Sequence, residues 1–181
     1  MSDATQTIRL EIQRIRPTAV LPSYAHEGDA GMDIVAAEAV TLAPGEVQAV
    51  PTGLILRIPR GYEVQIRPRS GLSLKTRLRL PNSPGTIDSG YRDELRILVE
   101  NSSQIQAASE ATYDLHVTDA PHGTYAIQAG DRIAQMVLAK VSQAEVVAVE
   151  AFSEHDTEDR GGGFGSSGVS TRRPSDARSG H

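Results

Sequence analysis

Short apolar runs recur along the chain, and glycines, prolines and polar residues separate them. Tyr62, Val64 and Ile66 alternate with polar neighbours, which is the period of a half-buried strand. The runs are too short and too often broken by Gly or Pro to form helices, apart from one or two helical turns at 71–76. We therefore predict strands within residues 8–15, 31–36, 47–58, 62–66, 95–99, 125–127, 133–141 and 146–152. So many short strands indicate an all-β sandwich or barrel.

The length of 181 residues fits one domain with a sizeable core, followed by a tail. Residues 102–123 are polar and weakly patterned, so we expect an insertion or an extended hairpin between two strands there. From residue 153 onward the chain is rich in Gly, Ser, Asp and Arg, a composition that cannot build a core. We expect a folded β-domain over residues 1–153 and a tail that is mobile without ligand.

Charge and composition exclude several classes of function. The net charge of -5 argues against a nucleic-acid scaffold, so any phosphate site must be local. The absence of Cys excludes disulfides and thiolate chemistry, and the five His form no spaced pair of metal-ligating type. No run approaches the roughly 20 apolar residues that span a bilayer. We expect a cytoplasmic protein that binds neither nucleic acid nor a membrane.

The most informative segment is a turn-rich stretch at 81–92 with the sequence PNSPGTIDSGYR. Its Gly and Pro residues predict a tight hairpin in which Ile87 anchors in the core while Asp88 and Tyr91 face a cleft. A carboxylate in that position could activate a water molecule. The alternative for an isolated Asp-Ser-Gly is that Asp88 only caps a turn through its own backbone.

Three further segments carry polar groups that suit an anion. Arg69, Ser70 and Gly71 open the predicted helical turn, where a guanidinium, a hydroxyl and backbone amides can approach phosphate oxygens. Gln135 lies on a strand that follows a glycine turn, and its amide can donate and accept hydrogen bonds. Asp33 brings a carboxylate to the start of another strand.

Each of these segments also has an ordinary alternative. Arginines beside a turn are usually solvated, and Asp33 could be an ordinary strand-entry aspartate. Asp131 and Arg132 could pair across their turn, an interaction worth roughly 0 to 1 kcal/mol.

Residues 160–168 combine Arg160, Phe164 and Ser166 with a run of glycines. A linker rarely needs both an arginine and an aromatic ring. A flexible chain with these groups can fold over a ligand, with the cation on a phosphate and the ring on a base. The segment therefore predicts a lid.

Taken in order, the segments around Asp33, Arg69, Asp88, Gln135 and Arg160 closely resemble the motifs of the trimeric dUTPases, the deoxyuridine triphosphate nucleotidohydrolases. The resemblance spans residues 8–168, and the PNSPGTID stretch is nearly unbroken. It implies a jelly-roll-like β subunit with one short helix, assembled as a homotrimer with active sites where subunits meet. It also implies hydrolysis of dUTP to dUMP and pyrophosphate, which keeps uracil out of DNA and supplies dUMP for dTMP synthesis.

The resemblance also implies roles for the nucleoside-binding residues. Asp88 would orient the water that attacks the α-phosphorus, and Tyr91 would pack beneath the deoxyribose and block a 2'-hydroxyl. Uracil would be read by the hairpin and its borders, namely Asn82, Gly85, Thr86, Ile87, Asp88 and Arg96.

The remaining motifs match the phosphate side. The phosphate contacts would come from Arg69, Ser70, Gly71 and Gln135. The closing contacts would come from an arm over residues 154–168 of another subunit, with Arg160, Phe164, Gly165 and Ser166. Asp33 would orient the arginine and the waters around Mg2+, which the triphosphate holds in place of a protein cage. Such chemistry needs charge neutralisation more than a side-chain nucleophile.

Three features depart from the family pattern. The arm has one residue fewer than usual between Arg160 and Phe164, the 102–123 segment is longer, and a basic stretch over 169–181 is expected to be disordered. Two other functions compete with dUTP hydrolysis. A dCTP deaminase-like enzyme of the same fold would need a carboxylate such as Glu100, and the arm argues against it. A non-catalytic nucleotide-binding relative would have no need of Asp88 and Tyr91.

Overall fold

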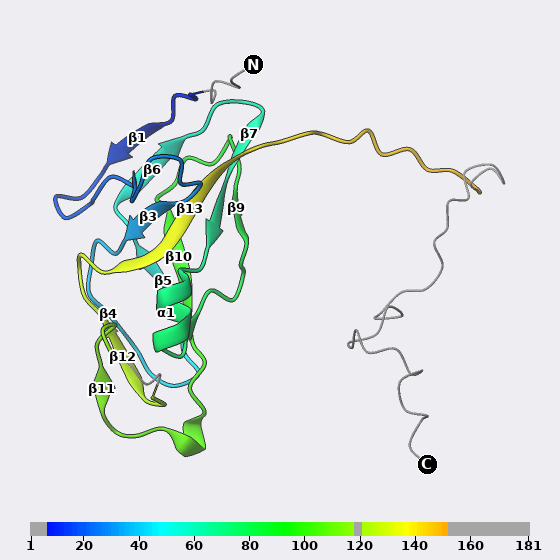
Figure 1. Ribbon diagram of the computed structural model, residues 1–181. Helices are drawn as coiled ribbons and strands as arrows, with labels where there is room; N and C mark the ends of the chain where they lie inside the picture. The colour runs from blue at the N-terminus through cyan, green and yellow to red at the C-terminus, as the bar shows by residue number, and fades with distance from the viewer. Residues whose placement is uncertain (1–6, 118–120, 152–181) are drawn as a thin grey trace, which may run out of the picture. The chain divides into compact units, whose positions relative to one another are not determined.

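The computed structural model describes residues 7–117 and 121–151 (Figure 1). The chain divides into two units, residues 1–143 and 144–181. The described part of the first unit is mostly β with one short α-helix, as predicted. Its elements are β1 (Glu11–Arg14), β2 (Ser23–Tyr24), β3 (Met32–Val35), β4 (Val40–Leu42), β5 (Val47–Pro51), β6 (Leu54–Arg57), β7 (Tyr62–Arg67), α1 (Ser70–Lys75), β8 (Leu78–Arg79), β9 (Gly85–Ile87), β10 (Arg96–Asn101), the 3-10 turn η1 (Ile105–Ala107), β11 (Thr112–Tyr113), β12 (Thr124–Ile127) and β13 (Arg132–Lys140).

The largest sheet is antiparallel, with the strand order β2-β3-β13-β7-β9. Figure 1 shows the long strand β13 running between β3 and β7. The other sheets have the orders β5-β10-β8, β11-β12-β4 and β1-β6. The large sheet therefore joins segments that are far apart in the sequence, because β3, β7 and β13 come from three separate regions.

The two faces of this sheet have different roles. Ile34, Ile66 and Met136 are buried on one face and belong to the main apolar core. Each buried aliphatic side chain of this kind stabilises the fold by about 1.5–3 kcal/mol. On the opposite face, Asp33 is the register partner of Gln135, and Gln135 is the register partner of Arg67 on the other side. Because strand side chains alternate between faces, the alternation that buries the core also places these polar groups in one row.

The predicted strand at 47–58 is wrong as a single element, because it divides into β5 and β6, which belong to different sheets. The break falls at Gly53, whose φ of +68° is a left-handed conformation that favours glycine. A Cβ at this position would lie 2.8 Å from the Cβ of Ala19, so the turn packs directly against the N-terminal loop.

The segment at 102–123 carries its own hydrogen-bonded structure in its described residues. Asn101 is fully buried, and its Nδ2 donates to the carbonyls of Leu42 at 3.0 Å and Gly123 at 2.8 Å. The backbone N–H of Gln104 donates to Nδ1 of His122 at 2.8 Å. Since β11 runs parallel to β12, these two strands do not form an antiparallel hairpin, and the insertion stays a prediction.

The predicted strand at 146–152 is absent from residues 146–151, and residue 152 lies outside the described part of the chain. These residues are exposed, and Val146 is 93% exposed. In the described part of the chain, no helix has both the length and the apolar character needed to cross a membrane.

Candidate active site

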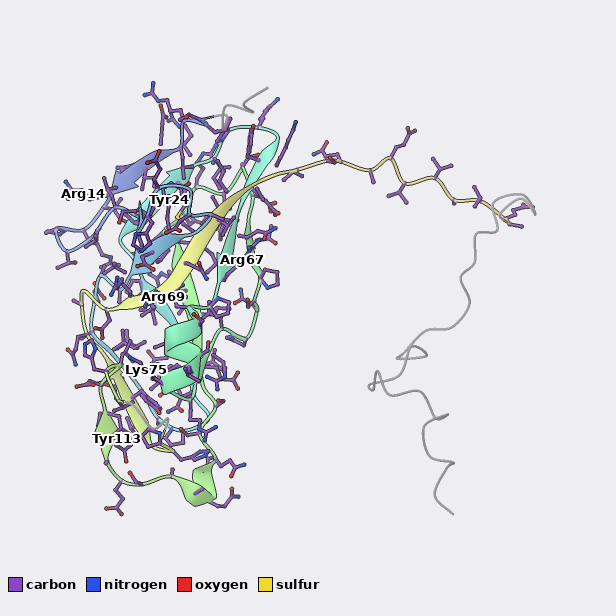
Figure 2. The ribbon with its side chains drawn as sticks, viewed as in Figure 1. Arg14, Tyr24, Arg67, Arg69, Lys75 and Tyr113 are labelled. Carbon is purple, nitrogen blue, oxygen red and sulfur yellow. The ribbon has the colours of Figure 1, made fainter. Side chains whose placement is uncertain are left out.

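A pocket of about 440 Å³ opens on the polar face of the large sheet, where β3, β13 and the start of α1 meet. Arg69 is the residue before α1, and the helix begins at Ser70. Figure 2 labels Arg69 beside β13 and above α1. The lining includes the sequence-predicted phosphate residues Asp33, Arg69, Ser70, Gly71 and Gln135, together with Ala25, Asp29, Ala30, Gly31 and Arg132.

Asp33 holds two arginines at this pocket. Its Oδ1 accepts a hydrogen bond from Nε of Arg69 at 2.8 Å, and its Oδ2 lies 3.2 Å from Nη1 of Arg132. The side chains of Asp33 and Arg69 are only 22% and 28% exposed, so this pair is more than a solvated surface contact. Arg132 pairs with Asp33 and not with Asp131, so the predicted alternative of a pair across the turn is wrong. Asp29 and Asp33 balance the charges of the two arginines in the lining, so what the pocket offers an anion is the remaining guanidinium N–H donors.

Gln135 is held by close contacts on both sides. Its Nε2 donates to the carbonyl of Pro68 at 2.9 Å, which joins β13 to the segment before α1. A Cβ at Gly31 would lie 2.3 Å from Oε1 of Gln135, so a larger residue there would displace the Gln135 amide. The amide is therefore fixed at the pocket by its neighbours.

The predicted hairpin contains β9, which is the edge strand of the large sheet and pairs with β7. Ile87 is partly buried and packs against the main core, as the sequence predicts. Gly85 is buried, and a Cβ there would lie 3.2 Å from Nδ2 of Asn82. The Asn82 amide therefore lies directly over the backbone of Gly85, next to the exposed Thr86.

Asp88 follows β9 and lines a second pocket of about 560 Å³, together with Arg60, Gly61, Tyr62, Glu63, Ser89, Val141 and Gln143. Its backbone carbonyl accepts a hydrogen bond from the N–H of Tyr91 at 3.1 Å, which closes the turn. Its carboxylate is exposed and makes no hydrogen bond or ion pair with any residue of the described segments. The carboxylate therefore does not cap its own turn.

Tyr91 and Arg96 both contact Glu94. The Tyr91 hydroxyl donates to the Glu94 carbonyl at 3.0 Å, and Nη2 of Arg96 lies 3.1 Å from Oε2 of the Glu94 carboxylate. The same carboxylate accepts from Nε of Arg16 at 2.9 Å and from the N–H of Gly53 at 2.9 Å. The hydrogen bond from Arg16 is the main cause that lowers the pKa of Glu94 from its ordinary value.

The sequence-predicted residues thus form two groups within one chain. Asp33, Arg69 and Gln135 meet in the first pocket, whereas Asp88 lines a pocket that contains none of them. The predicted arm residues Arg160, Phe164, Gly165 and Ser166 lie outside the described residues. Among residues 7–117 and 121–151, no group of three or more His, Asp or Glu side chains is arranged to hold a metal ion.

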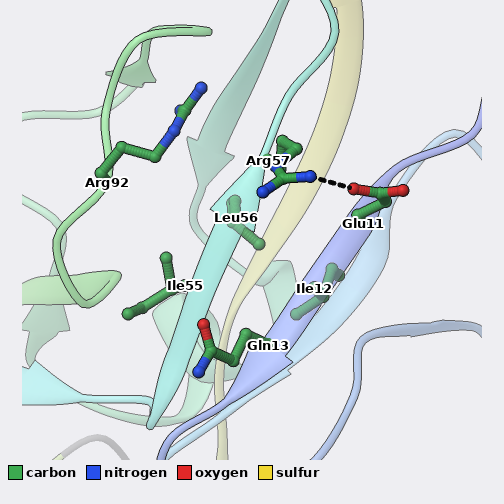
Figure 3. A pocket seen from close by; sticks show the side chains of 7 residues that line it. All are labelled: Glu11, Ile12, Gln13, Ile55, Leu56, Arg57 and Arg92. Carbon is green, nitrogen blue, oxygen red and sulfur yellow. Dashed lines mark hydrogen bonds and ion pairs between the residues drawn. The ribbon is translucent and has the colours of Figure 1, made fainter.

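A third pocket, of about 360 Å³, lies between β1, β6 and the loop that carries Arg92 (Figure 3). Arg57 pairs with Glu11 at 3.0 Å across the two strands, and Ile12, Ile55 and Leu56 supply apolar side chains. Arg92 lies on the far side of this pocket in Figure 3 and directly follows Tyr91. None of the residues predicted for the site lines this pocket.

Sequence reasoning assigned no role to Arg132, Glu94 or Arg16. Arg132 belongs to the GDRIAQ stretch, which also contains Gln135, but its partner Asp33 is 99 positions away, so the sequence did not reveal the pair. Glu94 and Arg16 are 78 positions apart, and no local pattern joins them.

The family model described as dUTPase matches residues 18–112 and 113–168 of the chain. The deoxyuridine 5'-triphosphate nucleotidohydrolase of Zymomonas mobilis is 47% identical over 164 residues, which cover 90% of this chain and 99% of the relative. The protein of the same name from Solibacter usitatus is 46% identical over 163 residues, which cover 89% of this chain and 97% of the relative.

Solved structures show the same similarity. A mutant dUTPase of Staphylococcus bacteriophage 80alpha with dUpNHpp matches with a TM-score of 0.81 and 33% identity, over 90% of this chain and 100% of the other. A mutant dUTPase from phage phi11 of S. aureus, described for its coordination of a structural Mg(II) ion, matches with a TM-score of 0.72 and 33% identity, over 80% of this chain and 99% of the other.

Proposed function

The chain belongs to the dUTPase family and is a deoxyuridine 5'-triphosphate nucleotidohydrolase, and from this we propose that Asp88 orients the water that attacks the α-phosphorus of dUTP. The observation that carries this role is the exposed Asp88 carboxylate, which has no partner within the described residues and faces a pocket. Such a carboxylate is able to accept a hydrogen bond from water. In the reaction the water oxygen bonds to the α-phosphorus, its proton passes to Asp88, and the bond to the bridging oxygen breaks. The products are dUMP and pyrophosphate.

The first pocket supplies hydrogen-bond donors that the triphosphate needs. Arg69 and Arg132 present guanidinium groups whose positions Asp33 fixes, and Ser70, Gly71 and Gln135 add neutral donors. Phosphoryl transfer depends mainly on positioning and charge neutralisation, so donors held in place before the substrate arrives are well suited to it. We assign the triphosphate to this pocket.

Mg2+ fits this arrangement as a partner of the nucleotide. Both Asp33 oxygens already accept from an arginine, and each keeps a lone pair that could accept from a metal-bound water. Magnesium usually keeps several waters and binds through substrate phosphates, and when bound it would neutralise phosphate charge. Asp33 would thus belong to the outer hydrogen-bond network.

The separation of the two groups supports a homotrimer of jelly-roll-like subunits with sites shared between chains. Phosphate and nucleoside residues of one chain line different pockets, which is expected where a neighbouring chain completes each site. The outer face of β5 and β10 offers an apolar surface for assembly, since Val47 and Leu98 are 50% and 37% exposed on adjacent strands. Trimers place equivalent surfaces around one axis, as such a shared site requires.

The remaining roles belong to the residues around the hairpin, here called the nucleoside half (Asn82, Gly85 to Asp88, Tyr91 and Arg96), and to the arm. Asn82 and the hairpin backbone would read uracil, Tyr91 would exclude a 2'-hydroxyl, and Arg96 would border the base. The arm over 154–168, with Arg160 and Phe164, would close over phosphate and base. We also assign residues 1–153 to the β-domain and 169–181 to an extension.

Product analysis tests the function directly. Protein incubated with Mg2+ and dUTP should release dUMP and pyrophosphate in equal amounts, and dCTP, dTTP and UTP should react far more slowly. Release of ammonia from dCTP would identify a deaminase instead. Binding of dUTP without any product would identify a non-catalytic relative.

A further inference from the structure

Glu94 connects two side chains of the nucleoside half through different atoms. Its backbone carbonyl accepts from the Tyr91 hydroxyl at 3.0 Å, and its Oε2 accepts from Nε of Arg96 at 3.2 Å. We infer that Glu94 is a positioning residue, which holds Tyr91 and Arg96 at a fixed distance from each other with the help of Arg16. This inference rests on the proposed roles of Tyr91 at the sugar and Arg96 at the base.

The Glu94 carboxylate is itself firmly held. Its side chain is only 9% exposed, and Arg16 donates to both of its oxygens, from Nε at 2.9 Å and from Nη2 at 3.2 Å. The backbone N–H of Gly53 adds a third donor at 2.9 Å. A paired arginine fork and a backbone amide leave a carboxylate little freedom to move.

The chain next to Glu94 is fixed to the β5–β6 turn. The N–H of Leu95 donates to the carbonyl of Leu54 at 2.7 Å, and the Leu95 carbonyl accepts from the Thr52 hydroxyl at 2.6 Å. A Cβ at Gly53 would lie 3.0 Å from the Cβ of Arg16, so the turn also packs against Arg16. The carbonyl that receives the Tyr91 hydroxyl therefore belongs to a rigid segment.

A rigid acceptor matters because Tyr91 would select the sugar by occupying space. Tyr91 as a residue is 37% exposed, so surrounding packing alone does not fix its ring. A ring that can tilt admits a 2'-hydroxyl, and a misplacement of about 1 Å can cost about 100-fold in a productive complex. Loss of the Glu94 contacts should therefore weaken the preference for dUTP over UTP and the binding of dUTP.

The test compares Glu94→Gln with Glu38→Gln. Glutamine keeps the size of Glu94 and the backbone acceptor for Tyr91, but it weakens the bonds of the side chain to Arg16 and the Gly53 N–H, which help to hold the backbone that carries this acceptor, and the bond to Arg96. Glu38 is an exposed second partner of Arg16, and within residues 7–117 and 121–151 it makes no hydrogen bond or ion pair with Tyr91 or Arg96, which makes its variant a matched control. For each protein, KM and kcat are measured with dUTP and with UTP, and Tm is recorded.

We expect Glu94→Gln to lower the ratio of kcat/KM for dUTP to that for UTP by at least about threefold and at most about 100-fold. The change should come mainly from a higher KM for dUTP, and Glu38→Gln should keep the wild-type ratio. If Glu94 had a purely structural role, the variant would contain less active enzyme. The apparent kcat would then fall equally for dUTP and UTP, and KM and the dUTP-to-UTP ratio of kcat/KM would stay unchanged. That result in folded Glu94→Gln would overturn the inference.

Arg16→Lys and Glu94→Asp provide a second measurement if Glu94→Gln does not fold. Arg16→Lys keeps the charge and loses the two-oxygen contact, so the ratio should fall by a smaller factor, and Glu94→Asp should retain more selectivity than glutamine does. An unchanged ratio in folded Arg16→Lys would also overturn the inference. Failure of the proposed function is separate, because wild-type protein would then release no dUMP from dUTP.

Discussion

The phosphate half and the nucleoside half of the candidate site are built in different ways. In the phosphate half, residues from β3, β13 and the start of α1 bond to one another, as Asp33 does to Arg69 at 2.8 Å and Gln135 does to the Pro68 carbonyl at 2.9 Å. In the nucleoside half, Asn82, Asp88 and Tyr91 lie within one short stretch of chain. Asp88 has no partner within the described residues.

The phosphate half is organised before the substrate binds, whereas the nucleoside half keeps a reactive carboxylate free. The arginines must be in place before a triphosphate with several negative charges arrives. A carboxylate that bonds to both of them fixes their positions even when no ligand is bound. A residue that orients water must keep its own acceptors available, so a paired Asp88 would be less useful. Each half is therefore suited to its proposed task, and each is incomplete without the other.

Asp88→Asn should have the largest effect and tests the nucleoside half. Loss of a positioned base lowers the rate by roughly 10²-fold to 10⁴-fold. The variant should still bind dUTP in calorimetry, because the phosphate pocket is unchanged. Asp93→Asn, an exposed acid in the same loop, is the control and should keep near-normal turnover. Near-normal turnover by Asp88→Asn would remove Asp88 from the mechanism.

Mixing two inactive proteins tests whether the halves come from different chains. Asp88→Asn protein supplies an intact arm, and protein truncated after Thr157 supplies an intact Asp88. If each site takes these two elements from different subunits, random exchange should restore about one quarter of the sites. Mass spectrometry of the mixture must show subunit exchange. Exchange without recovered hydrolysis would mean that Asp88 and the arm serve the same site from one chain.

Asp33→Asn should have an intermediate effect and tests the phosphate half. The change weakens the hydrogen bonds to Arg69 and Arg132, and a hydrogen bond to a charged group contributes about 1.5–3 kcal/mol. We expect kcat/KM for dUTP to fall by about 10-fold to 100-fold, which is the same free energy expressed as a rate ratio. Asp131→Asn, in the turn before β13, is the control. Equal kinetics for the two variants would show that the arginines do not depend on Asp33.

Local pattern predicted much of the fold, and tertiary contacts explain the rest. Alternation in Tyr62, Val64 and Ile66 predicted β7 correctly, and the helical turn was displaced by only one residue. The division of 47–58 falls at Gly53, whose left-handed conformation and nearby Pro51 are local turn signals, whereas the packing of this turn against Ala19 is a tertiary contact. The apolar run at 146–152 predicted a strand, although a strand also needs a partner strand.

The site shows the same limit. Asp33, Arg69, Gln135 and Asp88 were selected because their short motifs resemble those of a family, and the sheet register then brings the first three together. Glu94 lies outside the segments selected from the sequence, and its proposed role rests on contacts such as that with Arg16, 78 positions away. A sequence shows which side chains are available, whereas pairing over 78 positions appears only once the chain has folded.

The smallest expected effect concerns pH and sharpens the account of Glu94. Because Arg16 lowers its pKa in the folded protein, Glu94 adds stability that is full above its ordinary pKa of about 4.3 and is lost as pH falls through the lower folded value. Glu94→Gln should reduce the free energy of unfolding by about 1–3 kcal/mol at pH 7. In thermal scans at one protein concentration, the difference in Tm between wild type and Glu94→Gln should shrink from pH 6 to pH 3, whereas Glu38→Gln should follow the wild type. A difference that stays constant over this range would show that the charge of Glu94 is not what stabilises the cluster.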